Sequence, residues 1–408
     1  MIQILIYLNP ADLAIVCQCC SLLNTLTEKA VKLILQTISP EVMSRAMLRD
    51  VLQSNRGQSL KVYAKVTKPI IFTMGGAFSS QSIFEYSLLD NTWASKSDLP
   101  TAREDFEIIV SNIGLLAISG QDDVSTTSLD VYDYVQDEWL NPCALPVGLC
   151  RLAAVVVRGS LLIIGGEKTG ANTNIATVYT ITLDEVETVA RSKIDSNCLS
   201  ESTKPCWDEE SIPSLTYARR GHAAVVYRNE LWVAGGIITN AGTDEVSSSV
   251  EILSLGASGI DFYDNAWSEG PNLVSPKSNF SLVVSNEKLY AVGGDDEGTI
   301  EMFDDEINEW KVVSTFPSYR KNFSVTLVER KNPTVPKGTT VLSDCEDYSK
   351  ELSKLFASNL SLENLAALEE DEQNSSLIYV FGGQSRRGQN LSTWEEFDLT
   401  NGQVSNFS

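Results

Sequence analysis

The sequence is very poor in histidine, because His222 is the only one among 408 residues. A metal site with two histidine ligands is therefore excluded, and a Ser-His-Asp triad would have to use this single residue. Glycine motifs of the kind that cradle phosphates or dinucleotides are also missing. We therefore expect no metal and no other cofactor.

Positive charge is scarce as well. Lys and Arg total 31 and Asp and Glu 54, so the net charge is −23. Such a chain repels nucleic-acid backbones and anionic lipid headgroups. Long apolar runs are lacking too: Asn9, Pro10 and Asp12 interrupt the apolar stretch Met1–Val16 before it reaches the length of a bilayer span. We expect neither nucleic acid nor a membrane among the partners.

The cysteines follow no regular spacing. They are Cys17, Cys19, Cys20, Cys143, Cys150, Cys198, Cys206 and Cys345. This distribution does not indicate a disulfide framework, and no second Cys/His pair accompanies the first three at zinc-finger spacing. We interpret the thiols as structural, which fits a reducing compartment. The expected location is the cytoplasm, with the nucleus as a second one.

What the chain does have is a repeated unit. An apolar run ends in a glycine pair and is followed by a strand-like segment and a Trp. There are six copies, although Val404 stands where the sixth would have its Trp. The repeat residues are Gly75, Gly76, Trp93, Gly120, Trp139, Gly165, Gly166, Trp207, Gly235, Gly236, Trp267, Gly293, Gly294, Trp310, Gly382 and Gly383.

Each copy holds about four short apolar runs with period-two alternation. A lone four-stranded sheet cannot bury both faces, so the copies must stack, and radial stacking leaves only short, protected edges. The glycines suit a crowded centre where a strand must turn with positive φ and without a Cβ. We expect the aromatic residues to fill the space between blades. Basic residues tend to precede the inner strands: Arg103, Arg151, Arg219, Arg220, Lys277, Arg320 and Lys321.

This combination resembles the kelch repeat over roughly residues 69–408, most clearly from Ala218 to Gly236. The resemblance implies an all-β, six-bladed propeller over residues 59–408. The chain ends just after the outer strand of the sixth copy, so the inner strand of the first blade is missing from that end. Leu60–Val66 alternates suitably to supply it, and otherwise the first blade has three strands. Insertions at about 184–205 and 239–248 are expected to be exposed loops. A third, at about 331–375, is expected to be a solvated loop with a transient helix.

Residues 1–58 change to helical periodicity and predict a small helical segment before the propeller. Two resemblances compete for it. The run Leu8–Leu13 is similar to the helices that link BTB and BACK domains in the Kelch-like family, which implies a truncated member that binds cullin-3. The run Ile4–Leu13 also resembles an F-box, which implies binding to Skp1 and cullin-1.

The function expected from the resemblance is non-enzymatic protein binding. His222 lies inside a kelch strand-start motif, so a structural role is expected for it rather than a catalytic one. The resemblance implies a substrate-recognition adaptor of a cullin-RING ubiquitin ligase, whose propeller face binds a protein substrate. The alternative is an actin-associated kelch scaffold without a role in ubiquitin transfer.

Loops after each Gly-Gly and before each inner strand converge on one face of a propeller, where different side chains would line a common surface. The Arg and Lys residues of this set could hold acidic side chains of a substrate. On the positions that match the kelch pattern, the predicted substrate-binding residues are Phe78, Glu104, Asp122, Arg151, Glu167, Arg220, Lys277, Ser278, Asp295, Arg320, Lys321 and Arg386.

Overall fold

The computed structural model describes residues 70–75, 81–87, 92–121, 126–134, 136–194, 207–240, 242–256, 266–316, 320, 323–330, 375–385, 387, 389, 391, 393–399 and 404–407. Almost all of them belong to one compact unit. The predicted helical segment 1–58, the candidate strand Leu60–Val66 and residues 331–374 of the third insertion lie outside this part of the chain.

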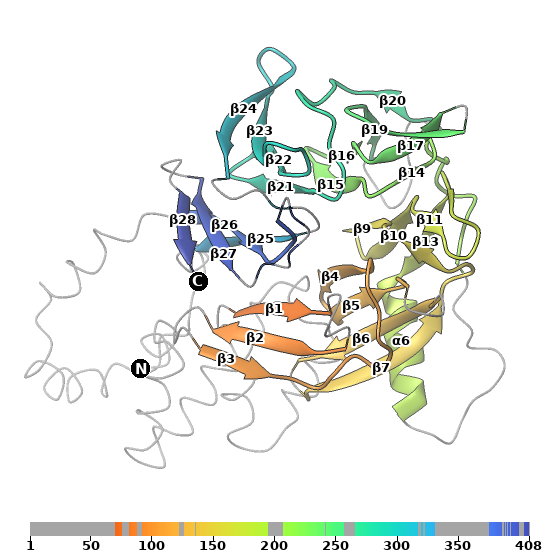
Figure 1. Cartoon of the computed structure of the whole chain (residues 1–408). Helices are drawn as coiled ribbons and strands as arrows, with labels where there is room; N and C mark the ends of the chain where they lie inside the picture. Colours follow the sequence, from red (N-terminus) through yellow and green to blue (C-terminus); the bar gives the residue numbers. More distant parts are fainter. Residues whose placement is uncertain are drawn as a thin grey trace, which may run out of the picture. The chain divides into compact units, whose positions relative to one another are not determined.

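The described residues form six main antiparallel sheets, which are the blades of a β-propeller (Figure 1). Blade 1 contains β1 (Ile70–Met74), β2 (Ile83–Ser87) and β3 (Thr92–Ser95). Blade 2 contains β4 (Glu107–Ser111), β5 (Gly114–Ile118), β6 (Ser128–Asp133) and β7 (Glu138–Ala144). Blade 3 contains β9 (Ala153–Val157), β10 (Ser160–Ile164) and β13 (Val178–Thr182).

The remaining blades each have four strands among the described residues. Blade 4 contains β15 (Ala223–Tyr227), β16 (Glu230–Ala234), β19 (Val250–Ser254) and β20 (Ser268–Glu269). Blade 5 contains β21 (Ser281–Ser285), β22 (Lys288–Val292), β23 (Thr299–Asp304) and β24 (Glu309–Thr315). Blade 6 contains β25 (Ser324–Arg330), β26 (Ser375–Phe381), β27 (Trp394–Asp398) and β28 (Val404–Phe407). The all-β, six-bladed propeller predicted from the repeat is thereby confirmed.

Two small sheets extend blades 3 and 4 beyond their glycine pairs. The first consists of β8 (Leu149–Cys150), β11 (Glu167–Lys168) and β12 (Thr173–Asn174). The second consists of β14 (Arg219–Arg220), β17 (Ile237–Asn240) and β18 (Thr243–Val246). The insertion at 239–248, predicted as a loop, is therefore largely a β-hairpin, because β14 pairs with β17 and gives the inserted residues a strand to add to.

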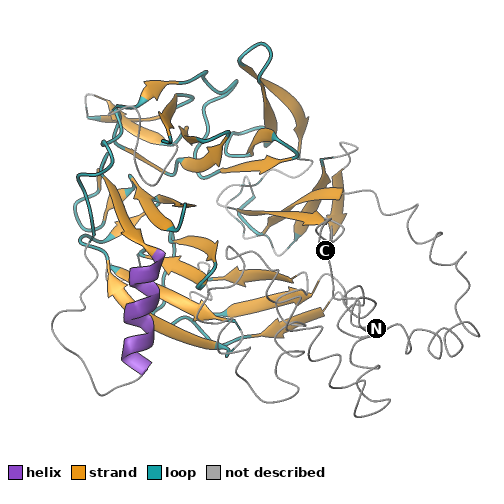
Figure 2. Cartoon of the chain, turned by 180° about the vertical axis from the view of Figure 1, so that it is seen from behind, coloured by secondary structure: helices purple, strands orange, loops and turns teal. Residues whose placement is uncertain are grey.

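The insertion at 184–205 also differs from the prediction, because its first part is the helix α6 (Leu183–Ile194) and not a loop (Figure 2). Thr182 and Glu185 form a capping box: the Thr182 hydroxyl accepts the Glu185 N–H at 3.3 Å, and the Glu185 carboxylate accepts the Thr182 N–H at 3.2 Å and the Thr182 hydroxyl at 2.7 Å. Val186 and Ala190, one turn apart, are buried as the helix contacts β7 and β13. Thr182 and Glu185, three residues apart, are the sequence signal that indicates this helix.

The core consists of apolar layers between neighbouring blades. On β10, Leu161 and Ile163 join the cluster shared with blade 2, while Leu162 and Ile164 join the cluster shared with blade 4. All four side chains are fully buried. Since successive side chains of a strand point to opposite faces, one continuously apolar strand serves two layers.

Four of the repeat tryptophans link blades 2 to 5 to the blade before each of them. The indole Nε1 donates a hydrogen bond to a backbone carbonyl of the preceding blade's outer segment, from Trp139 to Ser97 at 3.0 Å and from Trp267 to Pro213 at 2.8 Å. Trp207 and Trp310 make the equivalent bonds at 2.8 and 3.1 Å. The aromatic residues therefore lie between blades, as the sequence predicted, and also supply a polar link. Trp93 differs, being 49% exposed.

A candidate protein-binding surface at the Gly-Gly ends of the blades

The glycine pairs bring neighbouring blades into close contact. Gly235 has φ +63°, and a Cβ on it would lie 2.6 Å from the carbonyl oxygen of Lys277 in the next blade. Gly236 donates its N–H to that same oxygen at 2.8 Å. Equivalent bonds run from Gly120 to Leu149 and from Gly166 to Arg219, at 2.8 and 2.9 Å. A side chain here would force the blades apart, which explains the repeated glycine.

The loops that precede the inner strands are hydrogen-bonded to one another across four blades. The N–H of Arg151 donates to the Asp105 carbonyl at 2.9 Å, that of Gly221 to Arg151 at 2.8 Å, and that of Asn279 to Gly221 at 2.8 Å. All four residues have φ between +50° and +59°. Blades 2 to 5 thus present their loops on one continuous, hydrogen-bonded platform.

Buried ion pairs hold the loops before the inner strands in blades 2, 4, 5 and 6, and the first three of these blades belong to the platform. Arg219, with a fully buried side chain, donates to Glu251 at 2.6 Å and to the Gly235 carbonyl at 2.8 Å. Burial lowers the pKa of Arg219, and the charge of Glu251 opposes that shift. The other pairs are Arg103 with Asp130, Lys277 with Glu301, and Arg320 with Glu395. In each ion pair the Arg or Lys precedes the inner strand and the Asp or Glu lies on the third strand of the same blade. The pair thereby fixes the loop that carries the Arg or Lys.

Two predicted substrate-binding residues, Lys277 and Arg320, belong to these pairs. Lys277 is 0% exposed and Arg320 is 4% exposed. Lys277 also contacts Asp295 at 2.5 Å. Burial raises the pKa of Asp295, but hydrogen bonds from Lys277, Thr299 and Ser275 have the larger combined effect and lower this pKa to about 2. Lys277, Asp295 and Arg320 all have partners inside their own blade, so their side chains stabilise the loops.

The acidic half of each pair was missed at the sequence level. The four acids occupy equivalent places on the third strands of their blades. Each pairs with the second-strand residue that lies two positions before the glycine-pair position of that blade. They are Asp130, Glu251, Glu301 and Glu395. The repetition of one acid after each glycine pair was the signal that could have revealed them. Blade 3 departs from the pattern, with Leu149 and Tyr179 buried at these two places.

On the outer side of the platform, charges from three blades form a chain of ion pairs. Arg151 contacts Asp105 at 2.9 Å and Glu167 at 3.5 Å. Arg220 contacts the same Glu167 at 3.4 Å and Asp244 at 2.7 Å. Burial lowers the pKa of Arg151, but Asp105 and Glu167 outweigh this and raise it. The structure therefore brings three predicted site residues together: Arg151, Glu167 and Arg220.

The remaining predicted residues divide into two groups. Glu104 is exposed and forms a backbone bridge with Gln121, and the N–H of Ser278 donates to the Gly294 carbonyl at 3.0 Å. Phe78, Asp122, Lys321 and Arg386 lie outside the described residues. We define the rim surface as the side chains that lie on or beside the ion-pair chain, namely Glu104, Asp105, Arg151, Glu167, Arg220 and Asp244.

His222 lies in a joint between blades. A Cβ on Gly165 would lie 2.9 Å from its ring, just as a Cβ on Gly75 or Gly235 would lie 2.7 Å from the ring of Phe106 or Phe280. The side chain is 4% exposed, and burial, followed by the nearby charge of Arg219, lowers the pKa of His222 to about 3. A neutral imidazole thus fills the place that other blades give to a phenyl ring.

Two further observations concern other classes of site. Among the described residues, no group of three or more His, Cys, Asp or Glu side chains could hold a metal ion. None of the helices in the described ranges is long and apolar enough to cross a membrane.

Comparison with known proteins places these features in context. A family model described as the Kelch motif matches residues 276–317, which cover blade 5. Alpha-scruin and beta-scruin of Limulus polyphemus are 26% and 28% identical over 55% of this chain, and the matches cover 22% and 23% of their lengths. Kelch-like protein 15 of Homo sapiens is 22% identical over 60% of this chain and 41% of its own length. The chain therefore matches less than half of each relative.

Proposed function

We propose that this chain, a kelch-repeat protein that resembles the Kelch-like family and whose propeller is a protein-binding domain, presents a protein substrate to a cullin-RING ubiquitin ligase. The observation that carries the proposal is the hydrogen-bonded platform. Its loops come from four consecutive blades, and the backbone bonds from Asp105 to Asn279 fix their spacing. A preformed surface loses little conformational entropy when a partner binds.

The link to the ligase is supported by the Kelch-like relatives and by the resemblance of residues 1–58 to helices that bind cullin adaptors. In the BACK-like interpretation these helices bind cullin-3, and in the F-box-like interpretation they bind Skp1 and thereby cullin-1. The protein would work in the cytoplasm, and also in the nucleus.

The charges of the rim surface favour one kind of substrate. Arg151 and Arg220 each already contact two carboxylates, so an acidic substrate would have to displace Asp105, Glu167 or Asp244. Asp244 is the most accessible of these carboxylates, with 48% of its side chain exposed. We infer that the substrate contacts this surface with cationic or neutral polar groups, since they add to the network without breaking it.

The proposal is tested by purifying the full chain from cells with its bound proteins and probing for cullin-3, Skp1 and cullin-1. Recovery of cullin-3, or of Skp1 with cullin-1, is expected. A substrate should be recovered with it and should be lost from the rim variant, Glu104→Ala/Asp244→Ala, while the ligase component is retained. Recovery of no adaptor would contradict the ligase role.

The alternative function, an actin-associated scaffold, is separated by co-sedimentation of the purified chain with actin filaments. Sedimentation with actin and no adaptor in the purification would favour the scaffold. Substrate loss from the rim variant would still support the rim surface as the binding site in either case.

A further inference from the structure

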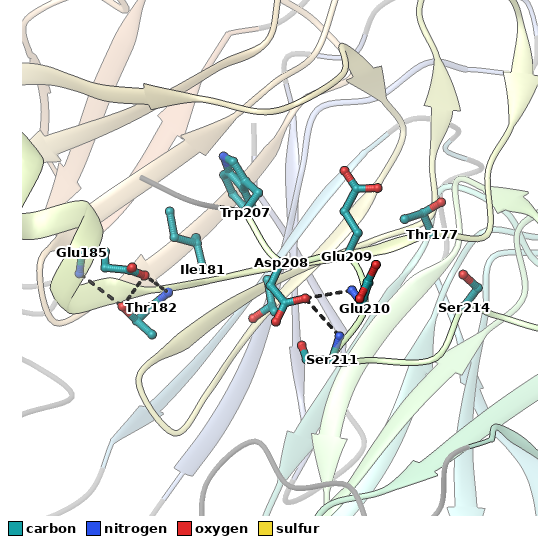
Figure 3. A pocket seen from close by; sticks show the side chains of 11 residues that line it. Thr177, Ile181, Thr182, Glu185, Trp207, Asp208, Glu209, Glu210, Ser211 and Ser214 are labelled. Carbon is teal, nitrogen blue, oxygen red and sulfur yellow. Dashed lines mark hydrogen bonds between the residues drawn. The ribbon is translucent and has the colours of Figure 1, made fainter. Parts of the chain in front are cut away.

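Among the described residues, the outer strand of blade 3 is reduced to a single bridge, and a groove lies beside it. Blades 2 and 5 end in the seven-residue strands β7 and β24, whereas within the described ranges β13 pairs on its outer side through the bridge of Thr180 with Asp208. The chain leaves β13 into α6 and is next described at Trp207. Between these segments lies a hollow of about 890 Å³ (Figure 3).

The groove is acidic. Its lining includes Glu185, Asp208, Glu209 and Glu210 and contains neither Lys nor Arg. Glu185 is engaged in capping α6, and Asp208 accepts N–H bonds from Glu210 and Ser211 at 2.8 and 3.0 Å. The exposed carboxylates of Glu209 and Glu210 neither accept a hydrogen bond nor form an ion pair within the described part of the chain. Two negative charges are thus available to a ligand.

A second, independent feature of the groove is an unsatisfied hydroxyl. Thr180 lines the hollow and is 4% exposed, and its Oγ1 has no hydrogen-bond partner among the described residues. A buried hydroxyl without a partner destabilises the folded state, and most buried polar groups in folded proteins are hydrogen-bonded. A ligand that reaches this hydroxyl from the groove would supply the missing bond.

The wall of the groove suits the stem of a long cationic side chain. Trp207 is half-buried, and its indole N–H is held by the Ala144 carbonyl at 2.8 Å, so the ring has a fixed position. Ile181 lies beside it in the lining (Figure 3). Lys and Arg side chains lay their methylene groups on such surfaces while their charged ends reach carboxylates.

We propose that this groove binds a short basic segment of a partner protein, with Glu209 and Glu210 as the carboxylates that hold its Lys or Arg side chains. The groove shares no residue with the rim surface, so it is a second interaction site. The net charge of −23 draws cationic segments toward the protein from a distance.

The experiment uses the full chain and a fluorescent peptide of alternating Arg and Ser, with fluorescence anisotropy measured at low and at physiological ionic strength. The double variant Glu209→Gln/Glu210→Gln is expected to weaken binding by about tenfold, as expected for the loss of two charge-assisted contacts. The matched control is Glu306→Gln/Glu309→Gln, which removes two exposed carboxylates outside the groove and changes the net charge equally. It should weaken binding by less than about twofold.

A third variant tests the hydroxyl. Thr180→Val is nearly isosteric and removes a group without a partner, so the protein should unfold at an unchanged or slightly higher denaturant concentration while peptide affinity falls. Equal weakening by the groove and control pairs would overturn the proposal, because it would mean that only the net charge attracts the peptide. Absence of peptide binding by the unaltered chain, or peptide affinity that is lost only in the rim variant, would overturn it too. Neither result bears on the adaptor role.

Discussion

The ion pair of Arg219 with Glu251 should be the most sensitive point of blade 4. The two side chains are 0% and 2% exposed, and Glu251 also accepts the backbone N–H groups of Thr216 and Tyr217 at 2.6 and 3.3 Å. Replacing Glu251 by Ala leaves the Arg219 charge buried without its acid, and leaves two backbone donors without their acceptor.

The expected loss follows from these contacts. Breaking a buried pair by removing one partner costs about 3 to 5 kcal/mol, and an orphaned buried donor adds about 1 kcal/mol or more. Glu251→Ala should therefore lower the free energy of unfolding by about 5 kcal/mol. That is a large part of the total for most domains.

Blade 3 supplies the matched control, because the same places hold Leu149 and Tyr179 there, and Pro146 stands where blade 4 has Thr216. Proline has no N–H that would need an acceptor. The triple variant Thr216→Pro/Arg219→Leu/Glu251→Tyr copies this apolar arrangement. It should remain within about 2 kcal/mol of the unaltered protein, since replacing a whole buried pair by apolar residues is often neutral.

The assay is equilibrium unfolding in guanidinium chloride, followed by tryptophan fluorescence and circular dichroism. Coincident transitions from the two probes are required before free energies are compared. If the triple variant is no more stable than Glu251→Ala, the assignment of the cost to an uncompensated charge is wrong.

Three further outcomes are expected from the same unfolding assay. His222→Phe should remove a pH dependence: the unfolded histidine takes up a proton near pH 6.5 and the folded one only near pH 3, so the unaltered protein should lose about 2 kcal/mol more than the variant between about pH 7 and about pH 5. An equal loss in both proteins would mean that His222 is not buried in its neutral form. Gly236→Ala should destabilise by about 2 kcal/mol or more, because φ is +88° and the new Cβ would lie 2.8 Å from the Arg220 carbonyl; an effect below about 0.5 kcal/mol would contradict the close blade contact. Trp267→Phe should cost about 1 kcal/mol through the lost bond to the Pro213 carbonyl, and no loss would indicate that this link is replaced by water.

The blades and their joints could be predicted because they depend on local, repeated features. Alternating apolar residues indicate strands, a glycine pair at the end of each second strand indicates a crowded turn, and both recur at each copy. His222 could be assigned to the repeat on the same basis, and its burial against Gly165 agrees with that assignment. The helix α6 was predictable too, from Thr182 and Glu185 at capping-box spacing, although the composition of the insertion suggested a loop.

The roles of the basic residues could not be predicted in this way. Arg219 and Arg220 are adjacent in the sequence, yet one is fully buried against Glu251 and the other joins the rim surface. Which of them turns inward depends on the strand pairing that places an acid 32 residues away beside it. Because both residues are Arg and carry the same charge, residue type alone does not distinguish the buried one from the accessible one.

The sequence by itself therefore determined the number of blades, the positions of the glycine pairs and the structural role of the histidine, because periodicity and local backbone geometry are properties of short segments. Only the tertiary structure decided which charged side chains are accessible and which loops lie side by side. Burial and ion pairing depend on contacts between residues far apart in the chain, and these contacts exist only once the blades have assembled around one another.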